Sequence, residues 1–169
     1  MKNIFYTLAF VFVSGFMLKA QAILPTSWSF TNTNLPTGWT QLGTLFYSAS
    51  GNTPPAMKFD GTGDYLEINI ASNPGAVTYY LAGNIATGSS FTGTFTVEES
   101  IDGNTWTTLH THTAPTIGSY TQYTDNPLAS TRYIRFIFTN KQSGNIGLDD
   151  VSIAIGAATP EQEINVKQG

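Results

Sequence analysis

The segment 141–155, KQSGNIGLDDVSIAI, constrains the fold more than any other part of the chain. Its apolar residues continue on both sides of two adjacent carboxylates, Asp149 and Asp150. Acidic residues are disfavoured in strands, and a buried carboxylate is costly unless it meets a cation or strong hydrogen-bond donors. The pair therefore either faces solvent, caps nearby turn amides or holds a ligand.

The same segment predicts an irregular strand. Side chains alternate between the two faces of a strand, so Leu148 shares a face with Asp150, whereas Val151 and Ile153 share the face of Asp149. One core face can receive both apolar sets only if an extra residue lies between them. We therefore expect a β-bulge at the acidic pair.

The N-terminus, residues 1–22, has the features of a secretory signal peptide. Lys2 gives it a positive start, residues 4–18 are almost wholly apolar, and Ala20–Ala22 form a small-x-small cleavage site. The apolar run is shorter than a typical membrane span, so an uncleaved anchor is the less favoured alternative. We expect a secreted or cell-surface protein that begins near Ile23, with no membrane insertion after cleavage.

The composition excludes several partners. Without Lys2 and Lys19, five basic residues remain against eleven acidic ones, a formal charge of −6. Such a chain lacks the basic stripe of nucleic-acid-binding proteins and a polybasic membrane patch. The remaining length, about 145 residues, suits one domain, and the absence of cysteine means that packing, with or without a metal, must hold an exported fold.

The mature chain reads as all-β with many short strands. Runs of β-branched and aromatic residues are separated by Thr, Ser, Asn and Gly, and helical periodicity is absent. The expected strands are 26–30, 40–47, 56–59, 65–70, 76–82, 91–100, 105–112, 120–124, 132–139 and 146–155. Residues 132–138 carry apolar side chains on both faces, which predicts a central strand, and Asp102-Gly103-Asn104 predicts a hairpin.

Five motifs together resemble the choice-of-anchor J domains of large secreted bacterial proteins. They are Trp28–Phe30, Leu35–Thr40, Ser100–Trp106, Arg132–Phe136 and Gly144–Val151. The resemblance implies a jelly-roll β-sandwich, similar in shape to MAM and galactose-binding-like domains, that serves adhesion, binding or spacing without catalysis. It also implies that Asp149, the first Asp of the Asp-Asp-Val strand, helps to hold a structural calcium.

The domain organisation follows from these features. We expect a signal peptide at 1–22, a sandwich domain at 23–156, and at 157–169 a linker with the first strand of a truncated following domain. Residues 160–169 resemble the opening strand of an immunoglobulin-like repeat of the Hydin or choice-of-anchor D type. The complete gene product would then carry further domains, and deletion of 157–169 would change the stability of the sandwich by less than about 1 kcal/mol.

Residues that could carry catalysis are few. The chain has no cysteine and no Gly-x-Ser-x-Gly elbow. His110 and His112 share one strand face, but zinc needs three or four ligands, and two surface histidines are the favoured interpretation. Glu98 and Glu99 point to opposite faces of a strand and cannot flank one glycosidic bond. We expect no enzyme activity.

Two kinds of binding site remain as candidates. Calcium takes six to eight oxygen ligands, and Asp149 and Asp150, with backbone carbonyls and with Asp60 or Asp64, could supply them. Trp39 follows the turn 36–38 and is the expected exposed ring for stacking on a sugar, whereas Trp28 and Trp106 are expected to be buried or packed in turns.

Three functions are consistent with the sequence. The first is a non-catalytic adhesion or ligand-binding module of a larger secreted protein, with a glycan or a cell-surface protein as partner. The alternatives are a carbohydrate-binding module that targets an attached catalytic domain, and the N-terminal fragment of a secreted hydrolase or nuclease.

Signal cleavage is expected directly after Ala22. Exported protein should therefore begin with Ile23, which N-terminal sequencing or intact-mass measurement would show. Exported material that retains Met1 would contradict this prediction.

Overall fold

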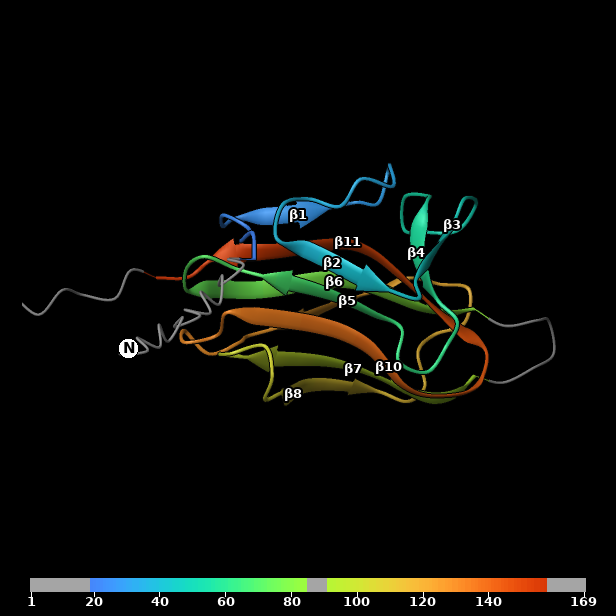
Figure 1. The fold of residues 1–169 in the computed structure, drawn as a ribbon. Helices are drawn as coiled ribbons and strands as arrows, with labels where there is room; N and C mark the ends of the chain where they lie inside the picture. The colour runs from blue at the N-terminus through green and yellow to red at the C-terminus, as the bar shows by residue number, and fades with distance from the viewer. Residues whose placement is uncertain (1–18, 85–90, 158–169) are drawn as a thin grey trace, which may run out of the picture.

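Two antiparallel sheets pack face to face in the molecule (Figure 1). The computed structural model describes residues 19–84 and 91–157. The five-stranded sheet has the order β2 (Trp39–Leu42), β5 (Tyr65–Asn69), β10 (Tyr133–Ser143), β7 (Thr92–Ser100) and β8 (Thr107–His112). The six-stranded sheet has the order β3 (Leu45–Tyr47), β4 (Ala56–Phe59), β11 (Asn145–Ile155), β6 (Pro74–Asn84) and β9 (Thr121–Asp125), and β1 (Thr26–Trp28) pairs with β11.

The connections make this sandwich a jelly roll. From β4 to β7, and again from β8 to β11, the chain changes sheet at every connection. The expected all-β, jelly-roll class is confirmed. The central position of the strand near 132–139 is also confirmed, because β10 lies between β5 and β7.

One expected strand is wrong in its extent. The stretch 40–47 forms two strands, β2 and β3, which belong to different sheets. The chain turns between them at Gly43, whose φ of +73° favours glycine and whose missing side chain leaves room for Asp64. The hairpin expected at Asp102-Gly103-Asn104 is confirmed, because β7 and β8 pair antiparallel on either side of it.

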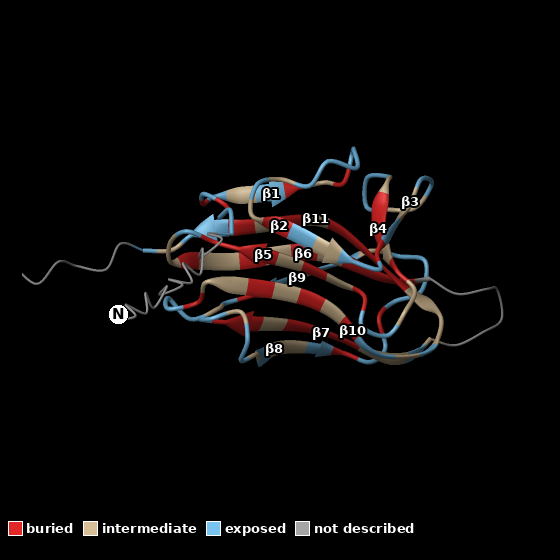
Figure 2. Cartoon of the chain, in the orientation of Figure 1, coloured by how far each residue is buried: buried red, intermediate tan, exposed pale blue. Residues whose placement is uncertain are grey.

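Aromatic side chains from both sheets fill the core. Phe59 of β4 meets Phe95 of β7 edge-to-face, with ring centroids 5.0 Å apart. Tyr79 of β6 meets Phe136 of β10 in the same manner at 5.1 Å. Such pairs contribute about 0.5–1.5 kcal/mol beyond the burial of their area. Buried and partly exposed positions alternate along residues 65–68 of β5 and 133–138 of β10, which gives the five-stranded sheet one core face and one outer face (Figure 2).

The β-bulge expected at the acidic pair is confirmed. Asp149 lies opposite Tyr80 of β6 and Ser152 lies opposite Thr78, so β11 has one more residue than β6 in this interval. Asp150 has a φ of +47°, in the left-handed region. As a result Ile146 and Leu148 before the bulge, and Val151 and Ile153 after it, are all buried in one core.

A buried polar network joins the edges of the two sheets at β8 and β9. The hydroxyl of Tyr79 donates to Asp125 Oδ2 at 2.8 Å and lies 2.9 Å from His112 Nε2, while His110 Nδ1 lies 3.0 Å from Asp125 Oδ1. The two histidines share a face, as expected, and their rings stack 4.0 Å apart. They are not both surface residues, because His112 is buried, and burial lowers its pKa to about 4.

The expectations for the two termini fall largely outside the described residues, which exclude 1–18 and 158–169. Ala22 lies beside β5, where its amide donates to Asn69 O at 2.7 Å and its carbonyl accepts from Ala71 N at 3.0 Å. Cleavage after Ala22 would remove this short bridge. Within the described part of the chain, no helix is long and apolar enough to cross a membrane.

Replacing Tyr79 with phenylalanine should destabilise the fold by about 1–3 kcal/mol, because Asp125 and His112 would lose a buried partner. Urea unfolding of the mature chain measures this change. The matched control is Tyr123→Phe, since the hydroxyl of Tyr123 makes no hydrogen bond to the described residues, and its cost should stay below about 0.5 kcal/mol. Equal costs for the two variants would contradict a stabilising role of the network.

Candidate functional site

A row of polar side chains crosses the outer face of the five-stranded sheet. The strand register places Glu67 of β5 beside Arg135 of β10, and Arg135 beside Glu98 of β7. Thr40 of β2 and Thr108 of β8 extend the row to the two edges. These side chains face outward because their neighbours along β5, β7 and β10 fill the core.

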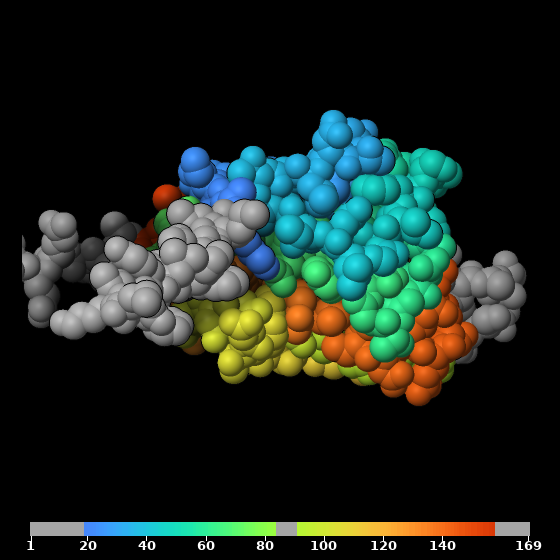
Figure 3. Space-filling model, viewed as in Figure 1, coloured from blue at the N-terminus to red at the C-terminus, as the bar shows by residue number. Residues whose placement is uncertain are grey.

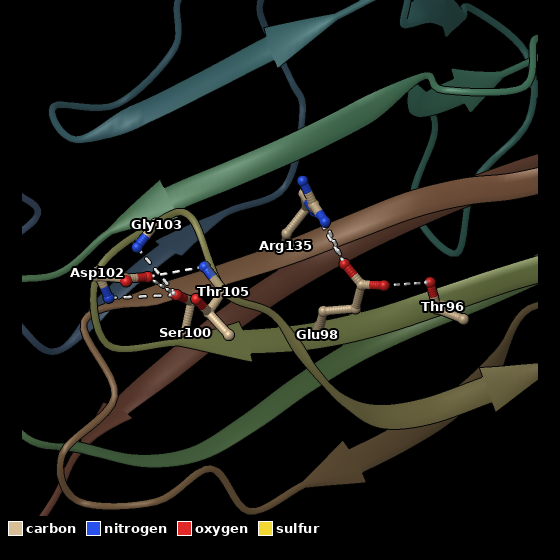
Figure 4. Close-up of polar contacts among 7 residues, drawn as sticks. All are labelled: Thr96, Glu98, Ser100, Asp102, Gly103, Thr105 and Arg135. Carbon is tan, nitrogen blue, oxygen red and sulfur yellow. Dashed lines mark hydrogen bonds and ion pairs between the residues drawn. The ribbon is translucent and has the colours of Figure 1, made fainter.

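Arg135 is held in place from two sides. Its Nε and Nη2 atoms donate to Glu98 Oε2 at 3.0 and 2.6 Å, and Glu98 Oε1 accepts from the hydroxyl of Thr96 at 3.2 Å (Figure 4). The guanidinium carbon also lies 3.9 Å from the ring centroid of Trp106. A charge-assisted hydrogen bond and a cation–π contact thus fix the guanidinium over the sheet.

The β7–β8 hairpin places Trp106 over the sheet. Asp102 Oδ1 accepts from the amide of Thr105 at 2.8 Å (Figure 4). It also accepts from the amide of Asn104 at 2.8 Å, so the turn closes on one carboxylate. The amides of Thr105 and Asn104 hold the pKa of Asp102 below its usual value. Gly103 has a φ of +73°. In the space-filling view the hairpin (yellow) lies against β10 (orange) (Figure 3).

The outer face combines aromatic rings with charged hydrogen-bonding groups. Trp106, Tyr133 and Tyr65 are each partly exposed on it. Rings that contact apolar surfaces, set among a few donors and acceptors, are typical of binding sites for small polar ligands. The face therefore suits a polyhydroxylated ligand, whose apolar ring faces can contact the aromatic side chains while its hydroxyls bond Arg135 and Glu98.

A shallow hollow continues this face towards β2. It has a volume of about 190 Å³, and its lining includes Lys19, Ala20, Thr40, Glu67 and Asn69. The Lys19 ammonium lies 3.8 Å from Glu67 Oε1, so the end of the expected signal peptide covers part of the polar row.

Trp39, the expected sugar-stacking residue, is not exposed. Only 4% of its surface is accessible, and its Nε1 donates to Thr26 Oγ1 at 3.2 Å. The strand begins one residue earlier than expected, so Trp39 opens β2 opposite the buried Ile68 and points into the core. Trp28 is buried as expected, but Trp106 is partly exposed on the surface.

Asp149 is buried beneath the loop that precedes β4. Its Oδ2 accepts from the amide of Thr53 at 3.1 Å and its Oδ1 from the amide of Asp150 at 2.8 Å. Burial raises the pKa of Asp149 to about 6, against the lowering effect of these amides. Asp150 is partly exposed and accepts from the Asn52 side chain at 2.9 Å. The acidic pair thus ties the loop to the bulge.

The four carboxylates considered for calcium do not meet at one place. Asp149 contacts the residue Thr53, before β4, whereas Asp60 and Asp64 follow the end of β4. Asp64 Oδ2 accepts from the amides of Asp60 and Gly61, and Asp60 pairs with Lys58. Among the described residues no three acidic or histidine side chains are grouped as a metal site. Any cation at Asp149 would therefore rely on Asp150 and on neutral oxygens.

Sequence reasoning missed the residues of the outer face. Alternation along the strand puts Arg135 on the face opposite Phe136, but its pairing with Glu98 depends on the register between β10 and β7. The Asp-Gly-Asn turn did signal the hairpin, but not that the hairpin would bring Trp106 over Arg135.

Comparison with known proteins finds solved structures that share the fold. No family model and no curated protein sequence matches the chain. The K1 adhesin domain of Lys-gingipain from Porphyromonas gingivalis is 21% identical, with a TM-score of 0.60 over 78% of this chain and 98% of that one. The K3 adhesin domain is 20% identical, with a TM-score of 0.61 and the same coverage. A xylan-binding domain of carbohydrate-binding family 22 is 14% identical, with a TM-score of 0.52 over 72% of this chain and 89% of that one. At these identities the likeness shows a shared fold.

The buried Asp149 predicts a pH effect on stability. The pKa of Asp149 is higher in the folded state than in the unfolded state, so protonation of Asp149 stabilises the fold. This contribution to the free energy of unfolding is fully present below the unfolded pKa of 3.8 and is lost as the pH rises through the folded pKa of about 6. In chelator-containing buffer, the wild type should lose stability relative to Asp149→Asn as the pH rises from 4 to 7. The measurement is urea unfolding of both proteins across this range. A stability difference that does not change with pH would contradict the raised pKa.

Proposed function

We propose that this chain is a non-catalytic, secreted adhesion or ligand-binding module, and that its binding face is the outer surface of the five-stranded sheet. The observation that carries the proposal is Trp106, held over Arg135 beside Glu98. A preorganised ring and ion pair reduce the ordering cost of binding. The adhesin and xylan-binding domains that share the fold support this class of function.

The ligand class we propose is a glycan. Carbohydrate-binding domains among the structural neighbours support this assignment, as does the mixture of aromatic, carboxylate and guanidinium groups on the face. Signal cleavage after Ala22 would remove Lys19 and Ala20 from the hollow at β2. The mature protein would then expose Glu67 and extend the binding row across the sheet.

The finer family assignment is part of the same proposal. A choice-of-anchor J or MAM-like domain, followed by a Hydin-like repeat, would place this module in a larger surface or extracellular protein. A protein receptor is the alternative ligand for such a module.

Replacing Trp106 with alanine should weaken glycan binding about tenfold or more, as truncation of a central aromatic contact does. The mature chain is first applied to a glycan array that includes plant polysaccharide oligomers, and the best ligand is then titrated by calorimetry.

Tyr80→Ala serves as the control for this experiment, because Tyr80 is a partly exposed aromatic residue on β6 of the other sheet. It should leave the affinity unchanged. Absence of binding to every arrayed glycan, or equal affinities of Trp106→Ala and wild type, would refute the glycan assignment.

A calcium ion at Asp149 and Asp150 is a separate proposal. A cation would compensate the buried charge of Asp149, and a ligand that binds only the folded state raises its stability by mass action. Addition of a chelator at pH 7.5 should therefore lower the melting temperature of the wild type but not of Asp149→Asn. Identical melting curves with chelator and with calcium would contradict calcium binding. Asp149 and Asp150 would then serve only to bind the amides and side chain of the loop before β4.

A further inference from the structure

A second hollow lies at the end of the sandwich, beneath the β7–β8 hairpin. Its volume is about 370 Å³, within the range of small-ligand sites. The hairpin contributes Ile101, Asp102 and Thr107 to its walls, the loop between β9 and β10 contributes Leu128 and Thr131, and Glu99 lies within it. This pocket is distinct from the outer face, because Glu98 and Glu99 point to opposite sides of β7.

Glu99 presents one free carboxylate oxygen in this pocket. The residue is 6% exposed, and its Oε2 accepts from the amide of Leu128 at 2.8 Å and from the hydroxyl of Thr131. Its Oε1 has no hydrogen-bond partner among the described residues. Among the described residues, the only side-chain polar atom that is both fully buried and without a hydrogen bond is Nε1 of Trp28. Oε1 of Glu99 also has no hydrogen bond to them, so it must retain some accessible surface through which a ligand can reach it.

The charge of the pocket is negative. Asp102 is its second carboxylate, and the amides of Thr105 and Asn104 favour its ionised form by lowering its pKa. No lysine or arginine is part of the lining. Arg132, which adjoins Thr131, donates instead to the carbonyls of Ala129 and Thr131 and to the Asn73 side chain.

We propose that this pocket binds a primary ammonium group on an alkyl stem, specifically the lysine side chain of a partner protein. The ammonium would bond Glu99 Oε1 and pair with Asp102, while Ile101 and Leu128 would contact the methylene groups. These two apolar residues are each 64% exposed at the rim, which favours a protein-borne lysine that covers them over a free amine.

Other cations fit the pocket less well. A guanidinium binds best through two parallel hydrogen bonds to both carboxylate oxygens, but Oε2 of Glu99 is already engaged twice. Calcium needs six to eight oxygen ligands, and among the described residues no three acidic or histidine side chains are placed to hold a metal ion. An ammonium needs only separate single acceptors, which Glu99, Asp102 and the threonine hydroxyls provide.

The test is a titration of the ¹⁵N-labelled mature chain with Nα-acetyl-lysine methylamide, followed by amide chemical shifts. Saturable shifts should be confined to residues 99–107 and 128–131, and the norleucine analogue, which lacks the ammonium, should produce none. Glu99→Gln should weaken binding about tenfold, because it removes the charge but keeps an acceptor for Leu128 and Thr131. Glu98→Gln, the same change on the outer face, should leave lysine binding unchanged.

Two further measurements test the apolar contacts and the source of the ammonium group. Leu128→Ala, at an exposed position that should not disturb folding, should weaken binding about threefold through loss of apolar contact. A lysine-containing peptide should bind more tightly than n-butylamine, because only the peptide covers Ile101 and Leu128. Equal shifts with the norleucine analogue, or an unchanged affinity of Glu99→Gln, would overturn the ammonium site. Equal affinities for butylamine and the peptide would overturn the protein-borne lysine.

Discussion

The extra residue at Asp150 is the constraint on which the sandwich depends. β11 pairs with β1, β4 and β6, so it is the strand through which most of the six-stranded sheet is joined. Without the bulge, Ile146 and Leu148 would face the core and Val151 and Ile153 would face the opposite side. The left-handed backbone of Asp150 allows all four to enter one core. The burial of Asp149, with its raised pKa, accompanies this arrangement.

Strand β7 supports two different surfaces with consecutive residues. Glu98 faces outward and fixes Arg135, whereas Glu99 faces inward at the end of the core and fixes the loop between β9 and β10. The hairpin that follows β7 borders both surfaces, since it carries Trp106 over the outer face and Asp102 into the end pocket. Period-2 alternation thus lets one short segment contribute to two chemically distinct sites.

Buried polar groups close the sandwich where apolar packing ends. Asp125 accepts hydrogen bonds from Tyr79 and His110 at one open side, and Glu99 accepts from two groups at one end. Through His110, Asp125 joins β9 to β8 of the other sheet, and Glu99 joins β7 to the loop between β9 and β10. Because a buried polar group is costly without its partners, such contacts specify one arrangement of loops and edges. The chain has no cysteine to do this by disulfides.

The sequence by itself determined the features that depend on local spacing. Alternation located nearly every strand, the Asp102-Gly103-Asn104 turn located the hairpin, and the mismatch between Leu148 and Val151 located the bulge. Turn residues and period-2 patterns act over a few residues, so they can be read along the chain.

Only the tertiary structure decided which side chains meet. Trp39 is buried because β2 pairs with β5 in the register that sets it opposite Ile68, and no local pattern states that register. Asp60 and Asp149 looked combinable in the sequence, but they lie beyond opposite ends of β4. The contacts of Arg135 with Glu98, and of Tyr79 with Asp125, join residues 37 and 46 positions apart. These contacts exist because strand pairing brings distant segments of the chain together. The apolar area buried over the whole core selects that pairing.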